Sequence, residues 1–406
     1  MKEFIGTIAS GDWLERERVL TYPIIILLLT IVSTGFVLFS NGGLLPNGSP
    51  FGSDFVSFWT AAREGLAGNF AVPYDRVLFE PVQNGLFPES DYFAFFYPPH
   101  YLVYMMPFGF LPYYGALLVW VLVTYCAAVF VLIKITEKPK ETFLLSLAFP
   151  AAFLTISHGQ NAFLSAALFG GALYLLPSRP VVAGILFGLL TFKPQLGLLI
   201  PFVLVAGGYW RTIFAAGGTL IALVLGSAMV LGVEIWTTFF AQSGYAVETM
   251  REGIVAWEKM ISPYAAFRLL GLPDLAASIV HYCIALTIAV FTIVVWLPRN
   301  HVPMAIKSAL LLCASLIVTP FSLNYDLFVL APAIAFVASF GMRAEFLSFE
   351  KSVIGLIYLS PIIVLLFMPL GISTAPIFLL LFFGLLVRRA MHEMGMVEIS
   401  QNPQST

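Results

Sequence analysis

Apolar runs, most of them about as long as one membrane crossing, alternate with short polar segments along the chain. A bilayer core about 30 Å thick is crossed by about 20 helical residues, so a run of roughly that length predicts a transmembrane helix. The candidates for spanning helices are 19–39, 113–133, 142–156, 161–176, 213–232, 276–297, 304–319, 322–341, 352–370 and 373–387. This pattern predicts an all-α, polytopic membrane protein.

The apolar stretch 181–208 differs from these runs because the sequence Lys193-Pro194-Gln195 interrupts it. About eleven apolar residues precede the break, and as a helix they reach only about 17 Å. A proline inside a helix removes a backbone hydrogen bond. The stretch is therefore either one long broken helix or a hairpin of two short half-spans.

The distribution of Lys and Arg favours the hairpin. With two half-spans the chain has about twelve crossings, both termini are cytoplasmic, and the basic residues left outside are Arg63, Arg76, Lys193, Arg251, Lys259 and Arg268, out of 20. With a single span the two sides carry nearly equal numbers, which conflicts with the positive-inside rule. We therefore expect a cytoplasmic N-terminal segment (1–18), one transmembrane domain (19–390) and a cytoplasmic C-terminal tail (391–406).

Two long loops, at about 40–112 and 233–275, lie outside in this topology. An apolar face repeats at helical spacing in the first loop, formed by Phe55, Trp59, Ala62 and Leu66. Ser53 stands in position to cap the start of this helix. An amphipathic helix of this kind is predicted to lie in the membrane interface rather than to cross it.

The composition agrees with a membrane protein, because 60% of the 406 residues are apolar and 10% are charged, against about 25% charged residues in soluble domains. A water-soluble enzyme is excluded. The net charge of −2 provides no basic surface, so no nucleic-acid partner is expected. The three cysteines have no metal-binding or disulfide spacing. The run 19–39 is too long for a cleaved signal and is predicted to be a retained first span.

The polar residues inside or beside the spans gather on one side of the predicted topology. Such residues are costly in a membrane and mark functional sites. The groups that reach the outer face are Asp54, Tyr97-Pro98-Pro99-His100, His158-Gly159-Gln160-Asn161, Lys193-Pro194-Gln195 and Asn324-Tyr325-Asp326. The inner face carries only short basic loops. This distribution predicts one polar site beneath the outer surface, assembled from the ends of several helices.

Each of these groups also has an ordinary structural interpretation. Asp54 can serve as a general base at the mouth of a cavity, or it can simply favour the start of a helix. Lys193 can bind an anion at a broken helix, or it can extend to the lipid head groups.

His100 and His158 can contact a ligand or be ordinary interfacial histidines. The aromatic run 92–101 is more typical of a membrane-interface belt than of a sugar-binding platform. The residues that can merely cap the following helix are Gln160, Asn161 and Asp326.

The sequence has no P-loop, no GxSxG or HExxH motif and no Asp-x-Asp pair that would hold a metal on a nucleotide diphosphate. Asp75 and Asp91 are isolated. An enzyme working on the outer face has no access to cytosolic nucleotide donors. Its activated substrate is therefore expected to be carried by a lipid.

Over about residues 50–330, the ordered polar motifs resemble those of glycosyltransferase family 87. The motifs are Ser53-Asp54-Phe55 with Phe58-Trp59, Phe96-Tyr97-Pro98-Pro99, Gly159-Gln160-Asn161, Lys193-Pro194-Gln195 and Asn324-Tyr325-Asp326. That family includes polyprenol-phosphate-mannose-dependent α-1,2-mannosyltransferases and belongs to the GT-C fold class. The resemblance thus implies a GT-C-type fold with about twelve transmembrane helices and outer-face interfacial helices.

The resemblance also implies a function. A hexose, in the first instance mannose, would pass from a polyprenyl-phosphate donor to a lipid or glycan acceptor with inversion. The active site would lie on the extracytoplasmic side of the plasma (inner) membrane. The acidic residue of the first outer loop, which acts as base in such enzymes, is Asp54 here. No metal or other cofactor is expected, and the partners are the two substrates and membrane lipids.

By the same resemblance, Lys193 with His158 or His100 would bind the donor phosphate. The residues expected to contact sugar or acceptor are Gln160, Asn161, Gln195, Asn324, Asp326, Tyr97 and Trp59. The second outer loop, 233–275, has no recognisable motif and is a candidate for shaping the acceptor site. About twelve spans and a broken helix also suit a secondary transporter or a lipid-linked glycan flippase. The absence of an internal repeat and the one-sided polar residues favour a transferase.

Overall fold

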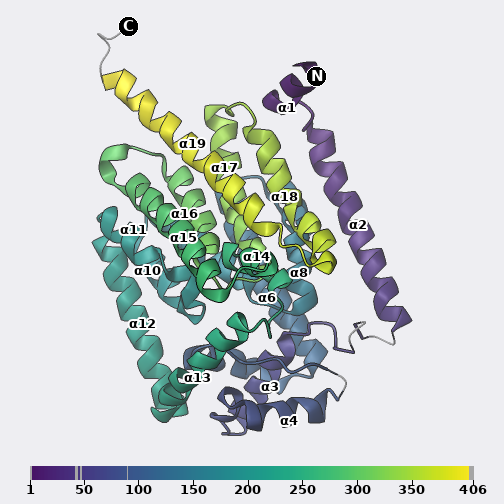
Figure 1. The fold of residues 1–406 in the computed structure, drawn as a ribbon. Helices are drawn as coiled ribbons and strands as arrows, with labels where there is room; N and C mark the ends of the chain where they lie inside the picture. The colour runs from purple at the N-terminus through teal and green to yellow at the C-terminus, as the bar shows by residue number, and fades with distance from the viewer. Residues whose placement is uncertain (1, 42–43, 46–47, 89, 402–406) are drawn as a thin grey trace.

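The computed structural model describes residues 2–41, 44–45, 48–88 and 90–401. These residues form a bundle of helices, and the β-structure among them is limited to two isolated bridges, Leu44 with Pro50 and Met260 with Leu323. Both ends of the described chain lie at the upper end of the bundle in Figure 1, on opposite sides, and the first long loop, predicted to be outside, lies at the lower end.

In the described part of the chain, seven helical stretches are long and apolar enough to cross a membrane. They are Arg16–Ser40 (α2), Tyr113–Thr136 (α6), Trp210–Leu231 (α12), Asp274–Trp296 (α15), Asn324–Ala344 (the 3-10 turn η7, Asn324–Val329, with α17, Leu330–Ala344), Glu350–Leu370 (α18, Glu350–Phe367, with the turn after it) and Ala375–Gly395 (the first part of α19, Ala375–Gln401).

The remaining apolar segments are shorter helices: α7 (Pro139–Ala148) and α8 (Pro150–His158), bent by 60° against each other, α9 (Ala162–Leu175), α10 (Pro180–Leu189), α11 (Ile200–Ala206) and α16 (Met304–Val318). Every apolar run predicted from the sequence is thus helical. Only seven reach the length of a crossing, or eight if the bent pair is one span, so the number of twelve crossings stays a prediction. Prolines in the first turn of α7, α8, α10 and α11 divide the chain into these short pieces.

The interrupted stretch forms a hairpin. The hydroxyl of Thr212, at the start of α12, donates to the carbonyl oxygen of Pro180, at the start of α10. The chain therefore leaves one end of the bundle at Pro180, breaks at Lys193 and returns to the same end. Gly184 permits the close packing of α10 on α12, because a Cβ atom there would lie too close to the Thr212 carbonyl oxygen.

The two loops predicted to be outside contribute helices to the structure. They are α3 (Phe55–Leu66), α4 (Arg76–Leu86), α5 (Pro99–Met105), α13 (Glu234–Arg251) and α14 (Pro263–Leu269). Of these, α3, α4 and α13 lie at the lower end of the bundle in Figure 1. Most of the residues of α3 are buried within the protein, which the amphipathic pattern did not predict. That α3 lies in the membrane interface stays a prediction.

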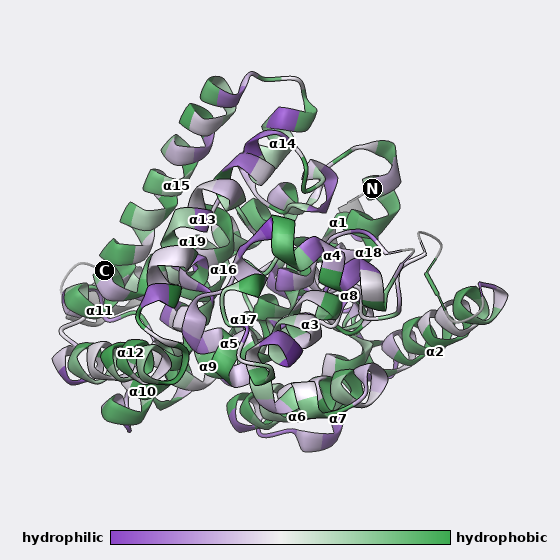
Figure 2. Ribbon diagram, turned by 90° about the horizontal axis from the view of Figure 1, so that it is seen from below, coloured by the Kyte–Doolittle hydropathy of each residue, from purple (hydrophilic) through white to green (hydrophobic). Residues whose placement is uncertain are grey.

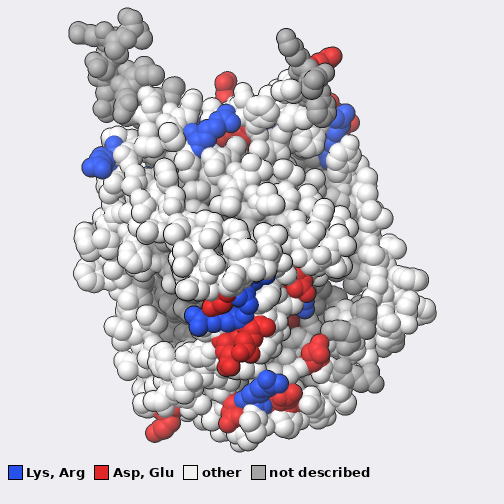
Figure 3. All heavy atoms as spheres, viewed as in Figure 1, with Lys and Arg blue, Asp and Glu red and all other residues white. Residues whose placement is uncertain are grey.

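A wide apolar band crosses the face of the bundle seen in Figure 3. Figure 3 shows a band without charged side chains between charged groups near the termini and a charged cluster in a hollow lower down. Helix α2 has one buried residue, Pro23, and presents large apolar side chains outward along its length. Seen from below, Figure 2 shows α2 as hydrophobic along most of its length, whereas hydrophilic residues gather over the outer helices. This surface fits a multi-pass membrane protein.

The terminal segments both pack on the bundle. The predicted N-terminal segment contains α1 (Lys2–Ser10), and the indole N–H of Trp13 donates to the hydroxyl of Ser352 at 2.7 Å. The predicted C-terminal tail starts at residue 391, but α19 continues as a helix to Gln401. Residues 402–406 of that tail, and residue 1, lie outside the described residues.

Candidate active site

A cavity of about 580 Å³ lies at the lower end of the bundle, between the outer helices and the tip of the α10–α11 hairpin. Most of the residues predicted to form the site line it. These are Asp54, Tyr97, His158, Gln160, Lys193, Gln195, Asn324 and Asp326. Five segments that are distant in the sequence thus meet around one polar space.

Asp54 occupies the N-cap position of α3, where Ser53 was predicted, but its side chain caps nothing. One carboxylate oxygen, Oδ2, accepts a hydrogen bond from Gln160 Nε2 at 2.8 Å. The other, Oδ1, has the Ser53 hydroxyl at 3.4 Å. No Lys, Arg or His of the described residues lies within 4.0 Å of the carboxylate. The wall of the cavity therefore carries an acid that no cation neutralises.

Gly159 brings Asp54 and Gln160 together. It ends α8 with a positive φ of 64°, a conformation that glycine adopts without strain. A Cβ atom at this position would lie 2.5 Å from the Cβ atom of Phe55, the first residue of α3. The end of α8 can approach the start of α3 this closely only because the residue is glycine, and the following residue, Gln160, then reaches Asp54.

The Gln160 amide is oriented by two donors. The hydroxyl of Tyr97 donates to Gln160 Oε1 at 3.3 Å, and the backbone N–H of Asn161 donates to the same oxygen at 3.3 Å. These bonds turn the amide nitrogen toward Asp54. Burial raises the pKa of Tyr97 far above its ordinary value, so its hydroxyl stays protonated and remains a donor.

Lys193 is not the isolated cation that the sequence predicted. Its ammonium group lies 2.5 Å from Asp326 Oδ1, with the two side chains 3% and 2% exposed, and it donates to Asn161 Oδ1 at 3.0 Å. It also lies 5.2 Å from the centroid of the Tyr325 ring. The positive charge of Lys193 is therefore already balanced by Asp326.

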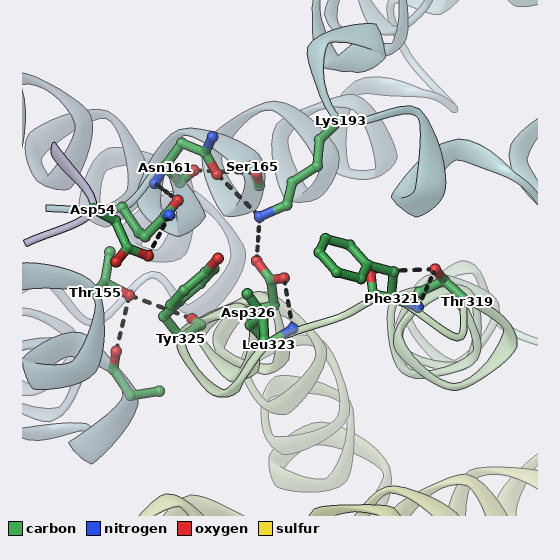
Figure 4. Close-up of polar contacts among 12 residues, drawn as sticks. Asp54, Thr155, Asn161, Ser165, Lys193, Thr319, Phe321, Leu323, Tyr325 and Asp326 are labelled. Carbon is green, nitrogen blue, oxygen red and sulfur yellow. Dashed lines mark hydrogen bonds and ion pairs between the residues drawn. The ribbon is translucent and has the colours of Figure 1, made fainter. Parts of the chain in front are cut away.

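These contacts form one connected network, which Figure 4 shows. Asp54 is bonded to Gln160, the next residue Asn161 is bonded to Lys193, and Lys193 is bonded to Asp326. The free carboxylate and the paired carboxylate are thus held at opposite ends of a single chain of polar side chains.

His158 lines the cavity beside Tyr325, with 5.9 Å between the ring centroids. Its Nδ1 atom lies 2.9 Å from the carbonyl oxygen of Leu154. Because a carbonyl oxygen only accepts hydrogen bonds, this contact places the ring hydrogen on Nδ1.

Two predicted residues lie elsewhere. His100 is buried against Trp236, with ring centroids 6.0 Å apart, and burial lowers the pKa of His100 to about 4, so it is neutral near pH 7. Trp59 donates from its indole N–H to the carbonyl oxygen of Leu111 and packs against Tyr113. Neither lines the cavity, because α5 and α3 turn these side chains into the aromatic core under the outer loops. Asn161 lies behind the cavity wall and contacts it through Lys193.

The cavity also contains charged and aromatic residues that the sequence did not single out. Arg76 and Glu80 of α4 form an ion pair at 3.0 Å, and Arg76 donates to the hydroxyl of Tyr245 on α13 at 2.9 Å. Lys259, from the second outer loop, lines the cavity and is exposed to it. The spacing of Arg76 and Glu80, four residues apart, was the one sequence signal for their pairing. No sequence feature near Arg76 or Tyr245 indicated that the first and second long loops contact each other.

Within the described residues, no three His, Cys, Asp or Glu side chains gather as ligands for a metal ion. That the reaction proceeds without a metal or other cofactor stays a prediction.

Comparison with known proteins gives one match. The family model of glycosyltransferase family 87 matches residues 95–320, more than half of the chain. No curated protein and no solved structure matches. The match covers three of the five segments that meet around the cavity, those of Tyr97, Gln160 and Lys193, and it ends shortly before Asn324. The chain therefore belongs to glycosyltransferase family 87, and it is a multi-pass membrane glycosyltransferase.

Proposed function

We propose that the enzyme transfers a hexose from a polyprenyl-phosphate donor to a hydroxyl group of an acceptor, with Asp54 as the general base. Mannose is the hexose that we propose. The observation that carries this proposal is the unpaired Asp54 carboxylate in the wall of the cavity, oriented by Gln160. Asp54 precedes the segment that matches the family, so its role rests on this geometry and on the resemblance of the motifs around it.

The proposed reaction is a single displacement. The acceptor hydroxyl gives its proton to Asp54 while its oxygen attacks the anomeric carbon. The bond between that carbon and the donor phosphate oxygen breaks, and the polyprenyl phosphate leaves with the electron pair. The anomeric configuration is inverted. A double displacement would need a second free carboxylate as nucleophile, and the nearby Asp326 is occupied by Lys193.

The negative charge that develops on the leaving phosphate needs cations or hydrogen-bond donors. Lys193 is engaged with Asp326, and Arg76 is engaged with Glu80. Among the described residues Lys259 is a cavity-lining cation for which the structure shows no carboxylate within 4.0 Å. We therefore assign the donor phosphate to Lys259 in place of Lys193. His158 can be a second ligand only as an imidazolium, because its Nδ1 hydrogen is bonded to the Leu154 carbonyl oxygen and Nε2 needs a proton to donate to phosphate.

The proposed side of the membrane follows from the charges. The cavity lies at the end of the bundle opposite to both termini (Figure 1). Most Lys and Arg residues of the sequence fall in the terminal segments and in the short loops at the same end of the bundle as the termini. This distribution supports a cytoplasmic position for that end. The cavity would then face outward, where a lipid-linked sugar is the available donor. A GT-C-type fold is part of this proposal.

The rival functions have less support. A secondary transporter or a lipid-linked glycan flippase needs no single unpaired acid, and the chain belongs to a family of glycosyltransferases.

The test is a transfer assay with purified protein in lipid vesicles. Radiolabelled mannose is supplied on a polyprenyl phosphate, and in parallel on a nucleotide diphosphate. The proposal predicts that only the lipid-linked mannose is consumed. Transfer from another polyprenyl sugar alone would keep the donor class and change the sugar. Consumption of the nucleotide sugar alone would refute the proposed donor.

A further inference from the structure

A second cavity, of about 290 Å³, opens on the membrane-facing side of the bundle. We call it the α2 cleft. One wall is formed by residues 27–35 of α2 and the other by residues 147–156 around the bend between α7 and α8, and Phe51 also lines it. No charged side chain lines it, so its ligand must be apolar.

The cleft exists because two helices diverge. Helices α7 and α8 bend by 60° at Phe149 and Pro150, since Pro150 ends the hydrogen bonding of α7. Helix α2 packs near α7 at its upper part and then leans away from the bundle, as Figure 1 shows. The wedge between them opens toward the apolar band, where it is accessible to a hydrocarbon chain from the bilayer.

The lower end of the α2 cleft lies beside the proposed base. Phe51 is followed by Gly52, whose N–H donates to the carbonyl oxygen of Ser157 at 2.9 Å. Ile156 lines the cleft, while His158, two residues later, lines the main cavity. The chain segments of Phe51 and Ile156, which line the cleft, are therefore the segments that carry Asp54 and His158 into the cavity.

A third, smaller cavity of about 190 Å³ reaches the site from another side. It lies between α13 and α15, and Phe321 lines both this cavity and the main one. Its lining includes Arg251, from the same outer loop as Lys259. Figure 4 shows Asp54 and Phe321 on opposite sides of the Lys193–Asp326 pair. One apolar cleft thus lies on the side of the base, and a cavity that includes Arg251 lies on the side of the basic loop.

This arrangement matches the geometry of an in-line displacement, in which the attacking oxygen and the leaving phosphate lie on opposite faces of the sugar. The base must lie on the side of the attacking oxygen. We propose that the acceptor is a membrane lipid whose hydrocarbon chain lies in the α2 cleft while its hydroxyl group reaches Asp54. This inference rests on the proposed function and selects the lipid from the two acceptor classes that the sequence left open.

The proposal is tested with variants in which a bulky side chain fills the α2 cleft. Gly35 lines it, and no atom lies within 4 Å of the position that a Cβ would occupy, so Gly35→Trp can place its ring in the cleft without distorting α2. Val32→Trp, on the same helix but 68% exposed and outside the cleft lining, is the matched control. Thr34→Trp, which also lines the cleft, serves as a second filling variant if the first lowers the melting temperature.

The proteins are reconstituted in phosphatidylcholine vesicles with radiolabelled polyprenyl-phosphate mannose. Total lipid extract and water-soluble glycan extract of the source organism are offered separately as acceptor pools. The wild-type enzyme is expected to move label into a new organic-soluble product. Gly35→Trp is expected to raise the half-saturating amount of lipid extract about tenfold or more, because the acceptor chain loses its apolar contacts, while the donor dependence stays unchanged. Val32→Trp is expected to match the wild type.

Three results would overturn the inference while the proposed function stands. They are label entering only the water-soluble pool, equal acceptor dependence in the filling and control variants, and a rise in the donor's half-saturating concentration in place of the acceptor's. Failure of the wild-type enzyme to consume any polyprenyl sugar is a different outcome, which would refute the proposed function itself.

Discussion

The Lys193 ammonium lies 2.5 Å from Asp326 Oδ1, and the two residues, 133 positions apart in the sequence, are almost completely buried. Lys193 comes from the tip of the hairpin and Asp326 from the turn that begins the α17 span. Through Asn161, the pair is linked to Gln160 and Asp54. This ion pair therefore fixes the hairpin against the bundle and supports the residues around the proposed base.

Replacing Lys193 by Met is expected to destabilise the protein by about 3–5 kcal/mol, because the substitution leaves the Asp326 carboxylate buried without a partner. Thermal unfolding in detergent measures the effect. The double variant Lys193→Met with Asp326→Leu should recover most of the lost stability, since it removes both charges. If Lys193→Met unfolds like the wild type but binds donor much more weakly, Lys193 is a phosphate ligand and the structural role is wrong.

Replacing Gln160 by Glu is expected to move the acidic limb of the pH–rate profile to higher pH. The new carboxylate would face Asp54 at the position of the present amide, and two neighbouring carboxylates oppose each other's ionisation. Gln160→Ala, which removes the amide without adding charge, should lower kcat about tenfold or more and leave the position of the limb nearly unchanged. A profile for Gln160→Glu that coincides with the wild-type profile would show that Gln160 does not contact the working base.

His100 provides a prediction about stability and pH. Burial lowers the pKa of His100 to about 4, against an ordinary value of 6.5. The unfolded chain therefore takes up a proton at higher pH than the folded protein does, and stability is lost as the pH falls from about 6.5 to about 4, by up to about 3 kcal/mol.

The variant His100→Phe should remove that part of the acid sensitivity, which thermal unfolding between pH 7 and pH 4 would measure. Its donor KM should equal that of the wild type, because His100 stacks on Trp236 away from the cavity. A strong rise in donor KM with unchanged acid sensitivity would instead indicate that His100 binds the donor phosphate.

The positions of the apolar helices were predictable because a bilayer imposes a length and a composition on each spanning helix, although only seven of these helices are long enough to cross it. The hairpin at Lys193 was also predictable, since the balance of Lys and Arg distinguishes it from a single span. The burial of α3 was not, because its amphipathic pattern is the same whether the polar face contacts water or the other outer helices. Only tertiary packing separates these two environments.

Much of the candidate site could be found from the sequence for a similar reason. Polar residues at the ends of spans are costly, so Asp54, Gln160 and Asp326 stood out against their apolar surroundings. Their pairing could not be found. Lys193 was interpreted as a free cation because its partner lies 133 residues away. Lys259 was missed because it lies in a loop rich in charged residues, where one more lysine carries no signal.

The most direct test of the proposed mechanism is a single-turnover comparison of wild-type enzyme and Asp54→Asn in lipid vesicles, with polyprenyl-phosphate mannose as donor. Asn preserves the size of the side chain and can still bond to Gln160, but it cannot accept the acceptor's proton. We predict an unchanged melting temperature, donor binding within about twofold of the wild type and a rate of transfer lowered by about 10²–10⁴-fold. Transfer by Asp54→Asn at close to the wild-type rate would contradict the assignment of Asp54 as the general base.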